Sequence, residues 1–249
     1  MGNILDSDKL LHNLENIDMV IHLAAFVTEP FNHLQNLQYE QVNSWGTLNV
    51  VRAIQKSSSV KFAFYMSSTA VYGFNNNIDS KINKPAPENG YGISKLNGEK
   101  YFTLLRKTHT TRIMQSANVF GFNNFLGIDG VLNTFMFDAI VSNEIKIYGD
   151  GKQTRPFVFI ESLTKDILDW VITPTNTDAL EIDFNASMNE LKDWIDDRLE
   201  NLNYRYINQN QKFPSQSFLI ADDSSYKQGQ LEKAWESFNN SIRIKKTKL

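Results

Sequence analysis

Short runs of apolar residues alternate with helix-like stretches through the first half of the chain. Residues 19–25, MVIHLAA, form a continuous apolar run that is typical of a strand buried on both faces of a parallel sheet. Similar runs follow at 60–66 and 112–120, and the pattern between them predicts helices over 34–56 and 91–107. Because strands alternate with helices at this spacing, we expect an α/β fold with a partial, doubly wound parallel sheet.

The second half of the chain has a less regular pattern. Its expected elements are a loop feeding a helix (123–143), short strands (145–148 and 157–160), a helix (161–172), a strand (179–187) and an amphipathic helix carrying Leu191 to Leu202. The final segment, 241–249, is basic and is interpreted as a solvated tail. These elements predict a smaller, mixed C-terminal region for binding substrate.

Composition and charge exclude several classes of function. The 249 residues carry a net charge of only −3, which gives no strong attraction to nucleic acid or an anionic membrane. The absence of cysteine excludes disulfides, thiol nucleophiles and cysteine-ligated zinc, and the four histidines lack metal-ligand spacing. No apolar run approaches the ~20 residues of a membrane helix. We therefore expect a cytoplasmic enzyme or binding protein with no metal, and His22 as a buried core residue.

Three polar residues stand where an open α/β sheet binds ligands. Ser68 follows the run 60–66, at a carboxyl end of the predicted sheet. Tyr91 and Lys95 are four residues apart and so share one face of a helix. An ammonium beside a phenol favours the phenolate, and a fall of about 3 pKa units corresponds to roughly 4 kcal/mol. We expect Tyr91 to remove a proton from a substrate oxygen that Ser68 holds.

Each of these residues also has a simpler interpretation. Tyr91 could begin a helix, Lys95 could be a solvated helix residue, and Ser68 could cap the end of a strand. The interpretation as a catalytic set depends on the order of several further segments along the chain.

Those segments are VIHLAA (20–25), SSTAVYG (67–73), YGISK (91–95), NVFG (118–121) and GDGKQTRPFVFIES (149–162), together with GNILD (2–6) and NSWGTLNVV (43–51). In this order they resemble the extended short-chain dehydrogenase/reductase superfamily, specifically its NAD-dependent sugar-nucleotide epimerase/dehydratase branch. UDP-glucose 4-epimerase-like members are the most similar. The resemblance implies a Rossmann-type fold, NAD as cofactor, a nucleotide-sugar substrate and a homodimer formed through the helix of Tyr91 and the one before it.

The resemblance also implies roles for individual residues. Ser68, Tyr91 and Lys95 would be catalytic, with Tyr91 and Lys95 also touching the cofactor. The other cofactor residues would be Asn3 and Ile4 beside the adenine, Leu23, Ala24 and Ala25 along the dinucleotide channel, and Asn43 behind it. Asn118 would bind the nucleotide sugar and Arg155 its diphosphate, because a guanidinium pairs with phosphate oxygens. A turn residue and a surface ion pair are the respective alternatives for these two.

The reaction class is narrowed by the two residues after Ser68. Dehydratases of this family carry an acidic residue there to protonate the departing hydroxyl, whereas this chain has Thr69 and Ala70. We therefore expect an epimerase, which oxidises a sugar hydroxyl and reduces the ketone from its other face. The alternatives are an NADP-dependent reductase of a keto sugar and a non-catalytic remnant of the fold.

Other positions depart from the family pattern. No G-x-x-G-x-x-G turn is present, and Gln115, Phe122, Pro156 and Ser162 replace residues usual in the family. We expect the chain to begin partway into the fold and to bind NAD weakly or not at all by itself. The expected domains are 1–122, Rossmann-like, and 123–249, for substrate, with 155–172 packing back on the first.

Overall fold

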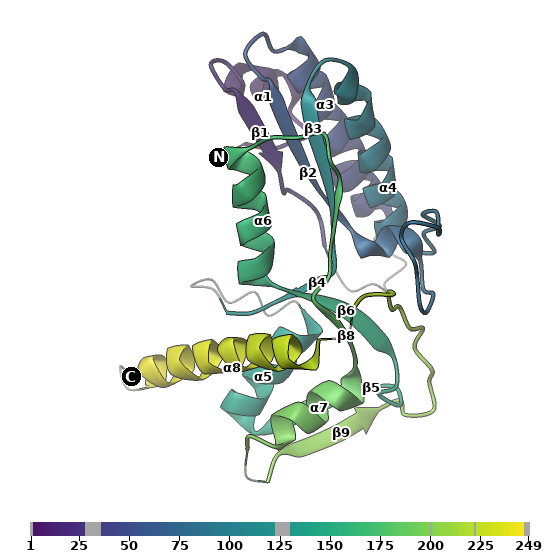
Figure 1. Cartoon of the computed structure of the whole chain (residues 1–249), viewed down its shortest axis with the longest axis vertical. Helices are drawn as coiled ribbons and strands as arrows, with labels where there is room; N and C mark the ends of the chain where they lie inside the picture. Colours follow the sequence, from purple (N-terminus) through teal and green to yellow (C-terminus); the bar gives the residue numbers. More distant parts are fainter. Residues whose placement is uncertain (1, 28–35, 123–129, 200, 222, 247–249) are drawn as a thin grey trace. The chain divides into compact units, whose positions relative to one another are not determined.

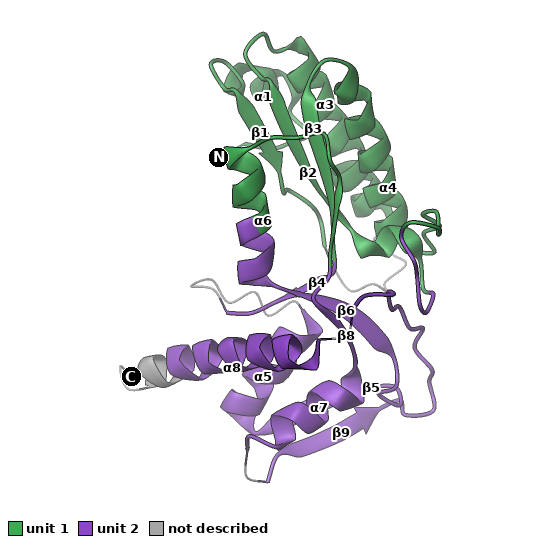
Figure 2. Ribbon diagram, in the orientation of Figure 1, with its two compact units in different colours: residues 1–74, 81–116, 166–181 green, residues 75–80, 117–165, 182–249 purple. Residues whose placement is uncertain are grey.

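The computed structural model describes residues 2–27, 36–122, 130–199, 201–221 and 223–246 (Figure 1). Two compact units divide the chain, and each is assembled from separated stretches (Figure 2). Unit 1 comprises residues 1–74, 81–116 and 166–181, and unit 2 comprises 75–80, 117–165 and 182–249. The expected division into domains at residue 122 stays a prediction.

Unit 1 contains a four-stranded parallel sheet. Its order is β1 (Met19–His22), β2 (Phe62–Ser68), β3 (Thr110–Ser116) and β7 (Ala179–Glu181). The chain returns from β1 to β2 through α2 (Asn36–Gln38), a π-helix (Tyr39–Gly46) and α3 (Thr47–Lys56), and from β2 to β3 through α4 (Gly90–Thr103). The expected α/β fold with a partial parallel sheet is therefore confirmed.

Helices cover both faces of this sheet (Figure 1). On one face Ala63 and Tyr65 of β2 pack in a buried cluster with Ile54 of α3 and Phe102 of α4, and α1 (Ser7–Asn13) lies beside α3. On the other face the ring of Phe64 lies 5.4 Å from that of Trp170, in the part of α6 (Ile160–Ile172) that belongs to unit 1. The alternation follows from the two-residue period of a strand.

His22 is buried at the end of β1, as expected. Its Nε2 lies 2.9 Å from Oγ1 of Thr47, and its ring stacks on Phe102 with centroids 5.9 Å apart. Burial, and secondarily the charge of Lys95, lower the pKa of His22 to about 3. This histidine is therefore a neutral core residue at physiological pH.

The π-helix corrects one detail of the predicted helix 34–56. A single apolar face on that helix would bury Leu37 and Trp45 together with Val51, but Leu37 and Trp45 are 75% and 66% exposed. The wider π turn shifts the phase of the following residues, so that Asn43 and Ser44 face inward instead. Residues 34 and 35 lie outside the described chain.

Unit 2 has two smaller sheets. β4 (Asn118–Phe120), β6 (Thr154–Phe159) and β8 (Phe184–Ser187) form one, and β5 (Glu144–Tyr148) pairs in parallel with β9 (Asn203–Ile207) in the other. Helices α5 (Val131–Ser142), α7 (Met188–Asp196) and α8 (Ser224–Lys246) surround them. An aromatic-rich cluster forms the core, including Phe120, Phe157, Phe184, Trp194 and Phe238.

Three expectations for the second half are corrected. The predicted strands 112–120 and 179–187 are each two strands, because the chain leaves the parallel sheet after Ser116 and after Glu181. The predicted basic tail is helical as far as Lys246, and its Ile242 is buried against the core of unit 2. Of the expected loop at 123–143, residues 123–129 lie outside the described chain.

Within the described ranges, no helix is both long and apolar enough to cross a membrane.

Candidate active site

Ser68 and Tyr91 meet where β2 ends and α4 begins. Ser68 is the last residue of β2, and its Oγ accepts a hydrogen bond from the amide of Ala70 at 3.2 Å. Its hydroxyl is close enough to Tyr91 to act against the rise in the pKa of that residue. Asn89 caps α4 by accepting a hydrogen bond from Gly92 N at 2.7 Å, which fixes Tyr91 in the first turn. Ser68 therefore caps a turn and also contacts the predicted base.

Gly92 explains how closely these elements approach. A Cβ atom at this position would lie 2.5 Å from the carbonyl oxygen of Ala70. Only a glycine allows the first turn of α4 to pack directly on the 3-10 turn Thr69–Tyr72 that follows Ser68. The glycine of the YGISK segment thus brings Tyr91 to Ser68.

Lys95 lies one turn further along α4 and is only 3% exposed. Its Nζ donates a hydrogen bond to the carbonyl oxygen of Met66 at 2.6 Å and lies 4.9 Å from the centre of the Tyr65 ring. Burial lowers the pKa of Lys95 to about 8, although the negative charge of Glu99 raises it. A cation with a pKa near neutrality is unusual and marks the position as a functional candidate.

The expected fall in the pKa of Tyr91 is not found. Burial raises it to about 12, a hydrogen bond from Ser68 acts in the opposite direction, and the nearby Tyr39 raises it further. The ring of Tyr39 packs edge-on against Tyr91, with centroids 5.8 Å apart. In this structure burial outweighs the favourable interactions, and the Lys95 ammonium is turned to the Met66 carbonyl. A lowered pKa of Tyr91 beside both Lys95 and the positive ring of an oxidised nicotinamide stays a prediction.

Asn43 holds the segment that follows β1. Its Oδ1 accepts from Phe26 N at 2.7 Å, and its Nδ2 donates to Phe26 O at 2.9 Å and to Ser94 Oγ at 3.2 Å. Ser94 Oγ in turn donates to the carbonyl oxygen of Tyr91 at 2.7 Å. Asn43 therefore joins the β1 end to the first turn of α4. Its place behind a cofactor channel stays a prediction.

The other expected cofactor residues lie on the surface of unit 1. Leu23 is 54% exposed, Ala24 is exposed and Ala25 is half-buried. Asn3 is exposed, and its Oδ1 accepts from Leu5 N at 3.0 Å. Ile4 packs so closely on Gly46 that an added Cβ there would lie 2.6 Å from its Cδ1. Their contacts with a cofactor stay predictions.

Unit 2 brings the two expected substrate residues onto neighbouring strands. Asn118 on β4 is paired in register with Phe157 on β6, and its Nδ2 donates to the carbonyl oxygen of Pro156 at 2.9 Å. Arg155 Nη1 donates to the carbonyl oxygens of Thr154 at 2.8 Å and Pro214 at 2.6 Å. Burial lowers the pKa of Arg155 to about 10, so it remains charged at neutral pH.

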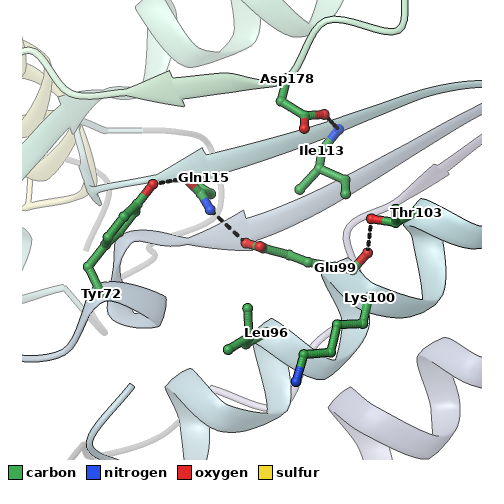
Figure 3. A pocket seen from close by; sticks show the side chains of 8 residues that line it. All are labelled: Tyr72, Leu96, Glu99, Lys100, Thr103, Ile113, Gln115 and Asp178. Atoms are coloured by element: carbon green, nitrogen blue, oxygen red, sulfur yellow. Dashed lines mark hydrogen bonds between the residues drawn. The ribbon is translucent and has the colours of Figure 1, made fainter. Parts of the chain in front are cut away.

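Glu99 was missed by the sequence reasoning. It lies four residues after Lys95 on α4, accepts hydrogen bonds from Ser67 and Gln115, and lines an open cavity of about 320 Å³ together with Tyr72 and Asp178 (Figure 3). The helical spacing from Tyr91 and Lys95 was the available signal. Among the described residues, no cluster of histidine and acidic side chains could hold a metal ion.

The comparisons with curated proteins give the following relatives. A "Putative UDP-glucose 4-epimerase" of Methanocaldococcus jannaschii is 31% identical over 191 residues, covering 74% of this chain and 61% of the relative. "dTDP-D-glucose 4,6-dehydratase" of Dictyostelium discoideum is 28% identical over 179 residues, covering 65% of this chain and 40% of the relative. The chain thus spans less than two thirds of the length of these relatives.

Solved structures share the fold. UDP-glucuronic acid 4-epimerase from Bacillus cereus, in complex with UDP-glucuronic acid and NAD, has a TM-score of 0.78 at 22% identity, covering 96% of this chain and 80% of that one. UDP-N-acetylglucosamine 4-epimerase from Methanobrevibacter ruminantium has a TM-score of 0.80 at 23% identity, covering 96% and 82%. The model of the NAD dependent epimerase/dehydratase family matches residues 1–182. This chain therefore belongs to the NAD dependent epimerase/dehydratase family.

Proposed function

We propose that this chain carries the catalytic centre of an NAD-dependent nucleotide-sugar epimerase. The observation that supports it most directly is the Lys95 ammonium, held by the Met66 carbonyl one turn after Tyr91, whose pKa the nearby Ser68 hydroxyl acts to lower. This arrangement offers a donor, a proton acceptor and a positive charge at the carboxyl end of a parallel strand, where such folds bind ligands.

Epimerisation is favoured over dehydration by the residues that follow Ser68. Thr69 is buried, at 3% exposure, and Ala70 carries no polar group, so neither can protonate a departing hydroxyl. The relatives include both reaction classes, since a putative epimerase and several dehydratases match the chain. Similarity alone therefore does not separate the two classes, and the side chains support the distinction.

The β1 end fits a cofactor that must approach the backbone. Exposed or half-buried alanines at positions 24 and 25 leave that edge free of bulky side chains, and Asn43 fixes the adjoining backbone at Phe26. Leu23, Ala24, Ala25, Asn3 and Ile4 would hold NAD from the side of unit 1. NAD would accept a hydride from the sugar carbon and would later return it to the resulting ketone.

The protein groups would move the accompanying proton. Ser68 would donate a hydrogen bond to the sugar oxygen, and Tyr91, as phenolate, would accept the proton of that hydroxyl. Tyr91 would return the same proton when the ketone is reduced from its other face, so the product is an isomer. Because the pKa of Tyr91 is about 12 without ligand, positive charge near the ring must lower it for the reaction to run at neutral pH.

In unit 2, Asn118 and Arg155 would bind the nucleotide sugar. A guanidinium matches the spacing of phosphate oxygens, and the charge of Arg155 persists despite its burial. Which sugar is epimerised is left to the experiment.

The test is a search for interconversion of 4-epimers. The chain is incubated with NAD and, in turn, UDP-glucose, UDP-glucuronic acid and UDP-N-acetylglucosamine, and the anomeric proton signals are followed by NMR. We expect one pair to interconvert, and we expect Tyr91→Phe to lower the rate at least about 10²-fold, as for loss of a general base. NAD binding, measured by calorimetry, should be retained in that variant.

The matched control is Tyr101→Phe, which removes a hydroxyl from the same helix at a residue packed against the core of unit 1. It should leave the rate near that of the unchanged protein. Epimerisation that survives Tyr91→Phe, or no interconversion of any of the three sugars, would count against the proposal.

A further inference from the structure

Three successive turns of α4 each place one side chain on the end of β2. Tyr91 interacts with the hydroxyl of Ser68, Lys95 donates a hydrogen bond to the carbonyl oxygen of Met66, and Glu99 accepts one from Ser67 Oγ at 2.5 Å. Tyr91, Lys95 and Glu99 are separated by four residues each and so follow one face of the helix. The proposed reaction uses the first two and leaves Glu99 without a role.

Glu99 accepts hydrogen bonds from two residues, Ser67 of β2 and Gln115 of β3, which are paired in register in the sheet. Gln115 Nε2 donates to the same Oε1 at 2.9 Å, and Tyr72 OH donates to Gln115 Oε1 at 3.0 Å (Figure 3). The bonds therefore run from Tyr72 through Gln115 to Glu99 and from Ser67 to Glu99. The ionised form of the carboxyl group is suited to accept both hydrogen bonds, because its oxygens carry lone pairs and no proton.

Several charged or titratable groups face the Glu99 carboxylate. Burial raises the pKa of the Glu99 carboxyl above its usual value. Hydrogen bonds from Ser67 and Gln115 lower it, Asp178, which precedes β7, raises it, and Lys95 of α4 lowers it. Tyr65 of β2 and Tyr72 also interact with its charge. Lys100 lines the same cavity. Among these groups, Lys95 matters most for the proposed reaction. The negative charge of Glu99 raises the pKa of Lys95, whereas burial lowers it.

We propose that Glu99 is a positioning residue, whose carboxylate anchors the β2 end through Ser67 and Gln115 and whose negative charge keeps Lys95 in its charged form. The link to catalysis rests on the proposed function, since that function is what requires a charged Lys95. The charge coupling between Glu99 and Lys95 is a property of this chain and can be measured without substrate.

The direct measurement is the titration of Lys95. Lysine labelled with ¹³C at Cε is incorporated, and the Lys95 signal is assigned by its loss in Lys95→Met. We expect its midpoint in the unchanged protein near pH 8, as burial dictates. In Glu99→Gln it should fall by about 1 pH unit, the size expected for losing a close opposite charge. Glu99→Asp should restore part of the shift.

The matched control is Lys100→Gln, which removes the next charge along α4 from the same cavity. It should leave the Lys95 midpoint within about 0.3 units of the unchanged value, because this difference is small beside the shifts caused by close charges. An equal midpoint in Glu99→Gln and in the unchanged protein would overturn the proposal. If Glu99→Gln fails to fold, the test is made on the unchanged protein. Its Lys95 signal should then show a second, smaller inflection at the pH where Glu99 titrates. A single inflection would refute the coupling.

A second readout separates charge from anchoring. Ser67→Ala keeps the Glu99 charge and removes one anchor, so it should lower the epimerisation rate without moving the pH at which activity is lost. Glu99→Gln should move that alkaline limit about 1 unit lower, in step with Lys95. If the Lys95 midpoint moves but no sugar is epimerised, the proposed function fails and the coupling stands. If a sugar is epimerised but the midpoint does not move, the coupling fails and the proposed function stands.

Discussion

The Lys95 ammonium donates its hydrogen bond to the carbonyl oxygen of Met66, 2.6 Å away, in a buried setting where its pKa falls to about 8. This bond ties α4 to the strand that ends in Ser68. It also sets the electrostatics of the site, since a buried cation is held where it could be discharged near neutral pH.

The first prediction concerns stability at alkaline pH. The pKa of Lys95 is lowered from 10.5 to about 8. Between these pH values the unfolded chain therefore binds more protons than the folded one, so the free energy of unfolding increases as the pH rises through that window. The gain should reach about 3 kcal/mol at most. Lys95→Met should lack this contribution. Urea unfolding of both proteins at pH 8 and pH 10 measures the difference, and parallel pH dependences would contradict it.

The buried His22 should lower the stability of the protein at acid pH. Its pKa is lowered from 6.5 to about 3, so stability falls as the pH drops below 6.5, when the unfolded histidine takes up a proton that the folded one refuses. Between pH 7 and pH 5 the loss should be about 2 kcal/mol.

The comparison variant for this effect is His22→Gln, whose amide can still bond to Thr47. It should remove most of that pH dependence in urea unfolding. His12→Gln is the control, because His12 is exposed and should leave the pH dependence unchanged.

Gly98 should be intolerant of a side chain. A Cβ there would lie 2.1 Å from the Tyr65 hydroxyl oxygen and 2.5 Å from the ring carbon that bears it, and Tyr65 is buried. Gly98→Ala should cost about 1–3 kcal/mol through overpacking. Gly229→Ala in α8 is the control, because nothing lies within 4 Å of its added Cβ. It should stabilise by about 0.5–1 kcal/mol. Thermal unfolding of both variants tests the contrast.

Removing the Asn43 amide should weaken cofactor binding. Asn43→Ala would leave the N–H and carbonyl groups of Phe26 without these partners, at a cost of about 1–3 kcal/mol. The segment that carries Ala24 and Ala25 should then be held less firmly. Calorimetry with NAD should show lower affinity for this variant than for Asn49→Ala, which loses one 3.3 Å bond to Ile4. Equal affinities of the two variants for NAD would show that Asn43 does not support the cofactor site.

Exposed apolar side chains lead us to expect a homodimer through α4 and the helix before it. Ile93 and Leu104 are 46% and 55% exposed, and their spacing of eleven residues puts them on one side of a helical path. Trp45, in the preceding π-helix, is 66% exposed. Trp45→Glu should therefore convert a dimer to a monomer in sedimentation equilibrium. A monomer in the unchanged protein would refute the expectation.

Local pattern by itself determined the parallel sheet and the shared helical face of two proposed catalytic residues, Tyr91 and Lys95. The apolar runs at 19–25 and 60–66 mark β1 and β2. Burial on both faces was wrong for the first run, because β1 ends the described sheet and its Ile21 is 39% exposed. The four-residue spacing of Tyr91 and Lys95 fixed their shared helical face, and extending it by one more turn would have reached Glu99. Residue types at 69 and 70 were enough to argue against dehydration.

Only the tertiary structure decided how these elements are used. The strand-like run 112–120 changes sheets after Ser116, because β3 pairs with β2 and β4 pairs with β6. The π-helix exposes Trp45 because its wider turn shifts the phase of the residues along it. The raised pKa of Tyr91 likewise depends on burial by residues far apart in sequence. Sequence spacing places charges on a common face, but the depth of burial determines which protonation state that face favours.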